Sequence, residues 1–126
     1  MVKLTETTLI LITLLLASPV WAEEGWATYY TEESCKKEGT SGVLTANGER
    51  YLEAGMTCAL PSRCFGCKVR VTSLTTGKSV ILRHNDYGPG KKPRSRGVVV
   101  DLTPTGFKAL GHPLSAGKIK VLVENL

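Results

Sequence analysis

The sequence has few aromatic residues, no surplus of negative charge, no internal repeat and no long apolar run. Phe, Trp and Tyr make up 6% of the chain, which argues against a platform that stacks the bases of single-stranded nucleic acid. The lack of a repeat excludes solenoid and propeller architectures. The longest apolar run, Leu9–Leu16, is too short to be a comfortable transmembrane helix.

What is present is the composition of one small globular domain. The chain has 126 residues, of which 42% are hydrophobic and 21% are charged, so it differs from a disordered protein. Lys and Arg exceed Asp and Glu, which gives a net charge of +5. This surplus favours an anionic partner such as nucleic acid, an acidic glycan or a bacterial envelope, without choosing among them.

The start of the chain has the organisation of a secretory signal peptide. Lys3 precedes the apolar run Leu9–Leu16, Ala17–Pro19 break this run, and Val20 and Ala22 occupy the −3 and −1 positions of a cleavage site. We therefore expect a signal peptide over residues 1–22, cleaved after Ala22, and one domain over residues 23–126 that is secreted or periplasmic. The residue directly after the cleavage position is Glu23 and not Cys, so a bacterial lipid anchor is not expected. A buried N-terminal helix or an uncleaved anchor is the alternative.

All four cysteines lie in the expected mature domain: Cys35, Cys58, Cys64 and Cys67. Four cysteines in a small exported domain most often form two disulfides, in one of three connectivities. Cys64 and Cys67 form a C-x-x-C pattern, which also occurs in redox pairs and zinc sites. A redox pair would need a helix after it, whereas a strand-like segment follows, and a zinc site would need two ligands where only Cys58 is near. Structural disulfides are favoured, and no metal is expected.

The mature chain reads as several short strands and one helix. The strand-like segments are Trp26–Tyr30, Lys68–Leu74, Ser79–Arg83, Val98–Val100 and Ile119–Val123. Thr103 and Pro104 are typical of a helix start, and Gly111 of its end. The charged segments Thr31–Gly42 and Lys91–Arg96 are expected to be surface loops. This pattern predicts a small all-β barrel.

Two aspartates lie at positions where a carboxyl group could act as a general acid. Asp86 ends a strand-like segment just before Gly88-Pro89, and Asp101 follows three valines. Apolar walls raise the pKa of a carboxyl group, which is what a general acid needs near neutral pH. Two carboxyl groups facing one cleft are the usual equipment for cleaving a glycosidic bond. Taken alone, Asp86 also fits a turn and Asp101 a helix start, and sequence spacing does not show whether they converge.

Four sequence blocks occur along the mature chain in a characteristic order. They are Gly25–Tyr30, Thr45–Tyr51, Phe65–Leu74, and Asn85–Pro89 followed by Val100–Thr103. Together they resemble the double-psi β-barrel domain of the rare lipoprotein A (RlpA) family, whose wider relatives include expansins and barwin-like proteins. The resemblance runs from Gly25 to about Val123. It implies a six-stranded double-psi β-barrel with one or two short helices.

The resemblance also implies an action on peptidoglycan. Active members of the family are endolytic lytic transglycosylases, which cut the bond between N-acetylmuramic acid and N-acetylglucosamine without adding water. The muramyl 6-hydroxyl closes onto C1 and leaves a 1,6-anhydro end. The implied partner is the glycan strand, with no nucleic acid, no membrane insertion after signal cleavage and a monomeric state. No cofactor is expected, because proton transfer and positioning suffice for this reaction.

Site residues carry over position by position. The resemblance implies that Asp86 is the main catalytic carboxylate, Glu49 a second acidic site residue, and Asp101 the acid-like carboxylate of the expansins and endoglucanases. It further implies substrate binding by Thr28, Tyr30, Asn47, Asn85 and Tyr87.

Three features leave the function open at this level. Leu52 and Leu60 stand where the family commonly has Asp and His, while His84 either supplies an imidazole or serves the strand. The run Lys91–Arg96 is either a solvated loop or a holder of the anionic peptide stems of the wall. A lytic transglycosylase, a non-catalytic expansin-like glycan binder and a barwin-like interaction protein all remain compatible with the sequence.

Overall fold

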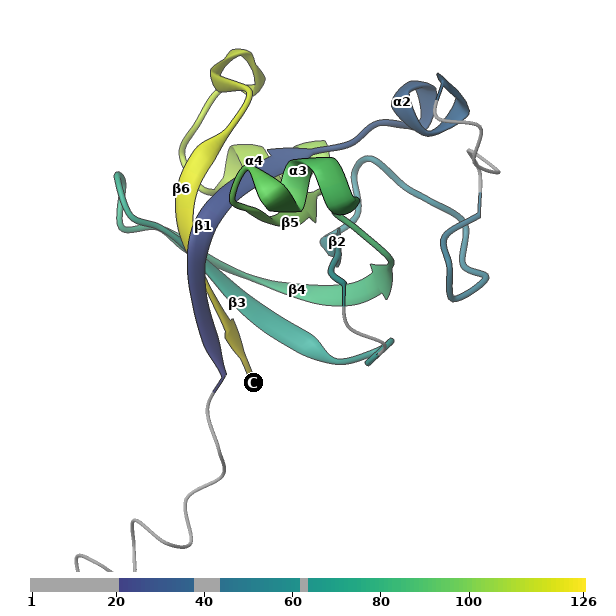
Figure 1. Ribbon diagram of the computed structural model, residues 1–126, viewed down its shortest axis with the longest axis horizontal. Helices are drawn as coiled ribbons and strands as arrows, with labels where there is room; N and C mark the ends of the chain where they lie inside the picture. Colours follow the sequence, from purple (N-terminus) through teal and green to yellow (C-terminus); the bar gives the residue numbers. More distant parts are fainter. Residues whose placement is uncertain (1–20, 38–43, 62–63) are drawn as a thin grey trace, which may run out of the picture.

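A computed structural model of the chain describes residues 21–37, 44–61 and 64–126 (Figure 1). The strands are β1 (Ala22–Tyr29), β2 (Thr57–Ala59), β3 (Lys68–Ser73), β4 (Ser79–Asp86), β5 (Val98–Leu102) and β6 (Ile119–Asn125). The helices are α2 (Glu32–Lys37), α3 (Lys91–Ser95), α4 (Pro104–Ala109) and the 3₁₀ turn η1 (Leu114–Ala116). None of these helices is long and apolar enough to cross a membrane. The expected signal peptide, apart from Trp21 and Ala22, lies outside the described residues.

The six strands close into a barrel in the order β1-β5-β2-β4-β3-β6. β1 pairs with β5, and β2 with β4, in parallel, while the other neighbours are antiparallel. The first and last strands lie side by side, with Trp26 opposite Lys120, and this contact completes the barrel (Figure 1). The predicted six-stranded all-β barrel is confirmed.

The core is built from alternating strand residues and one helix. On β3, Val69 and Val71 are buried while Lys68 and Arg70 are exposed, the alternation expected of a strand with one face inward. The Phe107 side chain of α4 is fully buried and packs edge-on against Tyr29, with ring centroids 5.0 Å apart. The barrel interior is therefore filled by side chains and is not a binding cavity.

The predicted helix start is confirmed at α4. Thr103 is the N-cap, and its Oγ1 accepts a hydrogen bond from the backbone N–H of Gly106 at 3.1 Å, while Pro104 occupies the first helical position. Phe107 and Leu110 of this segment are both buried. Local helix-start residues and apolar spacing therefore agree here with the tertiary structure.

Two segments predicted to be loops are helices, and one strand was not predicted. Residues 32–37 and 91–95 form α2 and α3 where loops were expected. α3 has no buried residue, so it carries no apolar periodicity by which a helix could be predicted. β2 has only three residues, all buried, and gains its strand conformation from pairing with β4 and β5.

Candidate active site

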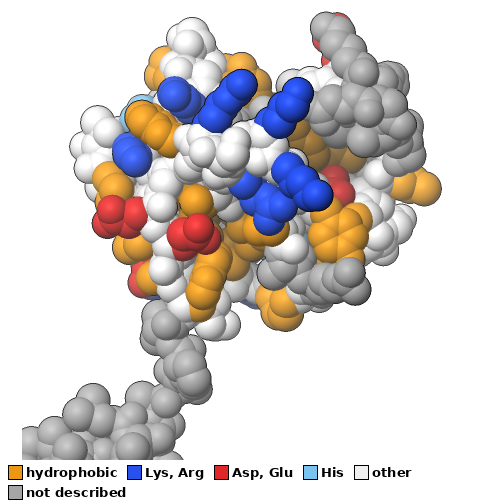
Figure 2. All heavy atoms as spheres, in the orientation of Figure 1, with side chains coloured by type: hydrophobic (Ala, Val, Ile, Leu, Met, Phe, Trp, Pro, Cys, Tyr) orange, Lys and Arg blue, Asp and Glu red, His pale blue; other side chains and the backbone are white. Residues whose placement is uncertain are grey.

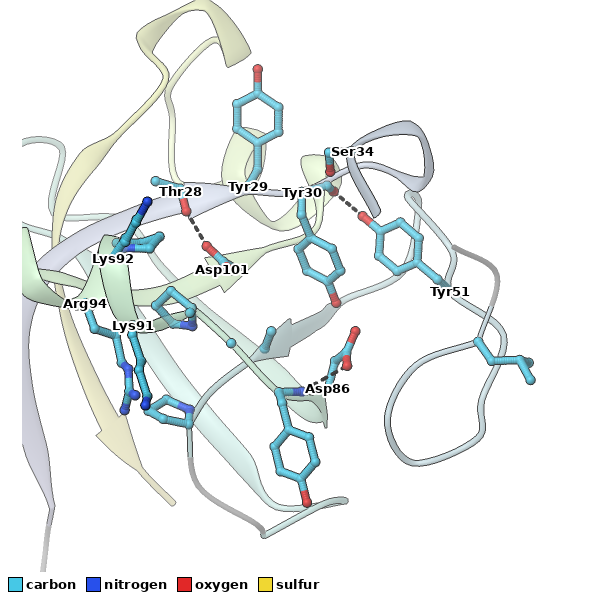
Figure 3. Close-up of a pocket in the computed structure, with 18 residues that line it drawn as sticks. Thr28, Tyr29, Tyr30, Ser34, Tyr51, Asp86, Lys91, Lys92, Arg94 and Asp101 are labelled. Atoms are coloured by element: carbon cyan, nitrogen blue, oxygen red, sulfur yellow. Dashed lines mark hydrogen bonds between the residues drawn. The ribbon is translucent and has the colours of Figure 1, made fainter. Parts of the chain in front are cut away.

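A groove of about 990 Å³ lies on the surface where β1, β4, β5 and α3 meet. Figure 3 shows the side chains around it, which come from segments far apart in the sequence. Residues that line it include Thr28, Tyr29, Tyr30, Tyr51, Asp86, Tyr87, Lys91, Lys92, Arg94 and Asp101. The groove thus combines two carboxylates with aromatic and basic side chains.

The barrel topology brings the two aspartates together. Ala59 of β2 is paired in register with Asp86 on β4 and with Asp101 on β5. The two aspartates therefore flank one residue, two strand spacings apart, or about 10 Å between Cα atoms. Both line the groove. Their convergence, which sequence spacing left open, is a property of the short central strand β2.

Asp86 is held by two backbone amides. Its Oδ1 accepts hydrogen bonds from the N–H of Ala46 at 3.0 Å and from the N–H of Tyr87 at 2.9 Å. Within the described part of the chain, no hydrogen bond reaches Oδ2. The carboxyl group is therefore fixed by one oxygen, and the other is available to carry a proton toward the groove.

Asp101 is held from two sides. The Thr28 hydroxyl on the neighbouring strand β1 donates a hydrogen bond to its Oδ1. Its Oδ2 lies against the backbone of Gly88, where a Cβ atom would be only 3.1 Å away. Gly88 also has a φ of +151°, which side-chain-bearing residues rarely adopt. Gly88 therefore lets the chain after Asp86 approach the Asp101 carboxylate closely.

If the groove is an active site, Gly88→Ala should lower its catalytic rate by about tenfold or more, because the added methyl group would displace Asp101 or the Asp86 segment. Gly90→Ala adds the same group where nothing lies within 4 Å and φ is not in the left-handed region, so its effect should be smaller. Urea unfolding and product release should be measured on both variants. An equal effect of the two substitutions would contradict the steric argument.

Glu49 lies outside the groove and is bound to Arg83. Arg83 Nη2 donates to Glu49 Oε2 at 2.7 Å and Nη1 donates to Oε1, while Asn47 Nδ2 donates to Oε1 at 2.6 Å. These hydrogen bonds, first the one from Arg83, lower the pKa of Glu49 to about 2. Glu49 is thus ionised and paired with Arg83, and its role as a second acidic residue of the site stays a prediction.

The bond between Glu49 and Arg83 acts on Asp86 through the turn at residues 45–49. Through Arg83, Glu49 fixes this turn to β4. The turn then places the Ala46 N–H within hydrogen-bond distance of Asp86 Oδ1. Asn47 N–H donates to the backbone carbonyl of Asn85 at 3.3 Å and adds a second tie. Glu49 therefore supports the site by position.

The free energy of unfolding should reflect the low pKa of Glu49. Because its folded pKa of about 2 lies below the usual glutamate pKa of 4.5, the stabilisation is present above about pH 4.5 and disappears as the pH falls toward 2. The difference between the wild type and Glu49→Gln should follow the same course in urea unfolding. An Arg83→Met background is the control and should weaken this pH dependence, because it removes the largest of the interactions that lower the pKa of Glu49. A difference that persists unchanged at pH 2 would contradict the pairing.

Two predicted substrate-binding residues have other roles in the structure. The Asn85 side chain is 2% exposed and does not line the groove. The Asn47 side chain accepts from the Thr45 hydroxyl and donates to Glu49, and it also lies outside the groove lining. The Asn47 side chain and the Asn85 backbone carbonyl take part in the turn behind Asp86, and substrate binding by these two residues stays a prediction. Thr28, Tyr30 and Tyr87 do line the groove.

Aromatic side chains form two walls of the groove. Tyr30 stacks on Tyr51 with ring centroids 4.7 Å apart, and the Tyr51 hydroxyl donates to the Tyr30 backbone carbonyl. Tyr87, which is 52% exposed, contacts Phe65 at 4.8 Å between centroids. Tyr51 also lines the groove but was not among the predicted site residues, although it lies within a block that carries the family resemblance. Phe65 packs against Tyr87 from outside the groove lining.

The positions that depart from the family pattern have different surroundings. Leu60 is 4% exposed and packs in the core, so this position offers no group to substrate. Leu52 is exposed on the surface. His84 is buried, and its two ring nitrogens face the backbone carbonyls of Cys64 and Asp86 at 3.2 and 2.8 Å. The imidazole of His84 therefore braces the end of β4 and does not face the groove.

The cysteines follow the expectation only in part. Cys64 and Cys67 are joined by a disulfide. Cys58 is a free, fully buried thiol on β2, and burial raises its pKa to about 12, so the expectation that it forms a disulfide is corrected. Cys35 lies in α2, but its side chain is outside the described part of the structure. Among the described residues no group of His, Cys, Asp and Glu could hold a metal ion.

Comparison with protein families identifies the class of this domain. A family model described as lytic transglycolase matches residues 22–123, which is most of the chain. The chain therefore belongs to this family, and the resemblance inferred from the sequence blocks is confirmed. The match also covers every strand of the barrel except the end of β6.

Several curated relatives carry the RlpA name. The chain is 38% identical over 103 residues to a probable endolytic peptidoglycan transglycosylase RlpA of Nostoc sp., which covers 82% of this chain and 25% of that protein. It is 44% identical over 85 residues to the endolytic peptidoglycan transglycosylase RlpA of Pseudomonas aeruginosa, covering 68% and 24%, respectively. The chain thus spans about a quarter of the length of these relatives.

Solved structures share the fold at low sequence identity. The Streptomyces papain inhibitor superposes with a TM-score of 0.61 and 20% identity, over 86% of this chain and 97% of the inhibitor. An expansin of Clavibacter michiganensis in complex with cellohexaose gives a TM-score of 0.60 and 21% identity, over 84% of this chain and 50% of the expansin. These likenesses establish the double-psi β-barrel fold.

Proposed function

We propose that this domain is an endolytic peptidoglycan transglycosylase that cleaves the bond between N-acetylmuramic acid and N-acetylglucosamine and leaves 1,6-anhydro ends. The observation that carries the proposal is the placement of Asp86 and Asp101 on either side of Ala59, both lining one open groove. The curated relatives named for this activity support the choice of substrate.

In this reaction Asp86 serves first as general acid. Its carboxyl group donates a proton to the glycosidic oxygen, and the bond from that oxygen to C1 of the muramic acid breaks. The muramyl 6-hydroxyl then attacks C1, and its proton passes to the Asp86 carboxylate, which restores the starting acid. No water is consumed, so a single carboxyl group placed beside the bond can perform both transfers.

Asp101 is suited to stabilise charge. As a carboxylate that accepts a hydrogen bond from Thr28, it holds negative charge beside the sugar ring when positive charge develops at C1. Tyr30 and Tyr87 offer aromatic faces for sugar rings along the groove. The groove thus provides a general acid, a stabilising negative charge and an aromatic surface for the glycan strand.

The direct test is mass spectrometry of soluble products after incubation of the purified mature domain with peptidoglycan sacculi. Release of anhydro-muropeptides is expected. Since the substrate is a wall polymer, we also propose that the domain works outside the cytoplasm, in the periplasm or beyond. We propose further that it is a monomer. Intact sacculi would overturn the enzymatic proposal.

A non-catalytic, expansin-like glycan binder is the second candidate. It is favoured by one observation, the replacement of the family histidine by Leu60, which is buried in the core. Sedimentation of the domain with sacculi that remain intact would select this candidate. Neither binding nor release would instead favour a barwin-like interaction protein.

A further inference from the structure

The basic side chains that line the groove come from one short helix. Lys91, Lys92 and Arg94 all belong to α3, and among the described residues no other Lys, Arg or His lines the groove. α3 lies on the connection between β4, which ends at Asp86, and β5, which carries Asp101. The same chain segment that joins the two aspartates therefore places the positive charges beside them.

Two of these charges lie on one side of α3. Lys91 and Arg94 are three residues apart, a spacing that makes side chains neighbours on a helix. Figure 3 shows these two side chains extending in the same direction, whereas Lys92 extends in the opposite direction. Both are exposed, and within the described part of the chain neither forms a salt bridge. Their charges are therefore available to a ligand in the groove.

The balance of charge in the groove favours a ligand that carries a carboxylate. The carboxylates of Asp86 and Asp101 would repel an anionic ligand that met no cation nearby. Figure 2, in the orientation of Figure 1, shows Lys and Arg side chains gathered on the face where α3 lies. A neutral sugar polymer would leave these cations without partners. A polymer whose carboxylate lies close to a sugar ring would use them.

We propose that Lys91 and Arg94 bind the lactyl carboxylate of a muramic acid in the groove, an inference that rests on the proposed function. Muramic acid differs from glucosamine by a lactic acid ether at O3, whose carboxylate is ionised wherever no peptide is attached. The Arg94 guanidinium can donate two parallel N–H groups to this carboxylate, and the Lys91 ammonium adds a third donor. Because N-acetylglucosamine has no such group, the pair fixes which of the two alternating sugars lies beside Asp86.

The test compares two forms of one soluble, fluorescently labelled glycan strand that carries no peptides. In the first form the lactyl carboxylates are free, and in the second carbodiimide coupling to methylamine has converted them into neutral amides. Binding is measured by fluorescence anisotropy at physiological salt, in an Asp86→Asn background so that the strand stays intact. We expect the form with free carboxylates to bind about tenfold more tightly.

The variant Lys91→Gln/Arg94→Gln should lose this preference, by weaker binding of the carboxylate form and nearly unchanged binding of the amide form. α3 has no buried residue, so the fold should be preserved, and urea unfolding checks this. Lys68→Gln/Arg70→Gln is the matched control, because it removes the same two side-chain types from exposed positions on β3 outside the groove lining. This control should keep the preference.

Four results would each overturn the proposal. Equal binding of both strand forms by the parent protein would show that the carboxylate is not recognised, and so would the absence of binding to either form. An equal loss for both forms in the Lys91/Arg94 variant would assign these side chains to the sugar in general. A loss of preference in the Lys68/Arg70 control as well would reduce the effect to the net charge of the domain.

Failure of the inference can be told from failure of the proposed function. Active domain is incubated with the same two strand forms, and anhydro ends are measured by mass spectrometry. Anhydro ends formed equally from both forms would retain the function and remove the inference. Carboxylate-dependent binding without anhydro ends would retain the inference and leave a glycan binder.

Discussion

Asp86→Asn is expected to lower the release of anhydro-muropeptides from sacculi by about a thousandfold or more, because the amide cannot donate and then regain the catalytic proton. The substitution is otherwise mild. The amide oxygen can still accept from the N–H groups of Ala46 and Tyr87, so the turn at residues 45–49 should stay in place. Product release is followed by mass spectrometry over time.

The control for this experiment is the free energy of unfolding of the same variant in urea. It should stay close to that of the wild type, which separates a loss of chemistry from a loss of fold. If Asp86→Asn released products at the full rate, the acid would have to be another group, and Asp101 would be the next residue to replace.

Phe107→Ala is expected to lower the free energy of unfolding by about 4 kcal/mol, which is the usual range for removing a large core aromatic. The Phe107 ring is fully buried and packs edge-on against Tyr29. A small domain has a total stability of only about 5–15 kcal/mol, so this loss would leave little margin. Urea unfolding at neutral pH measures the effect.

Phe107→Leu is the matched variant and should lose less than half as much, because leucine refills part of the space. Both variants should keep their activity per folded molecule at low temperature, since Phe107 does not line the groove. A loss below about 1 kcal/mol for Phe107→Ala would mean that the core closes around the gap.

The presence of Leu60 limits which side chains of the site can transfer protons. The family histidine is absent, and the only nearby imidazole, that of His84 in the described residues, is buried against two backbone carbonyls. In the proposed reaction, Asp86 then carries out both proton transfers. This places a greater demand on its position, which Glu49 and Arg83 secure through the turn that holds Ala46.

Local chemistry was enough to predict several elements. The alternation in Lys68–Leu74, the apolar strand ending in Asp101, and the Thr103-Pro104 helix start each depend on near neighbours, and the structure confirms them. The strands at residues 119–123 and 79–83 were also predicted, although both extend further in the structure. Such features are visible in sequence because burial and capping repeat at fixed spacing.

The sequence by itself determined that the chain makes a small all-β barrel of the RlpA-like kind and that Asp86 and Asp101 are its candidate carboxylates. Only the tertiary structure decided that β2 lies between them, that Glu49 forms a salt bridge with Arg83, and that Cys58 is a buried free thiol. The reason is that strand order and side-chain partners depend on contacts between residues far apart in the chain. Local pattern carries no record of such contacts, and the closed barrel creates them.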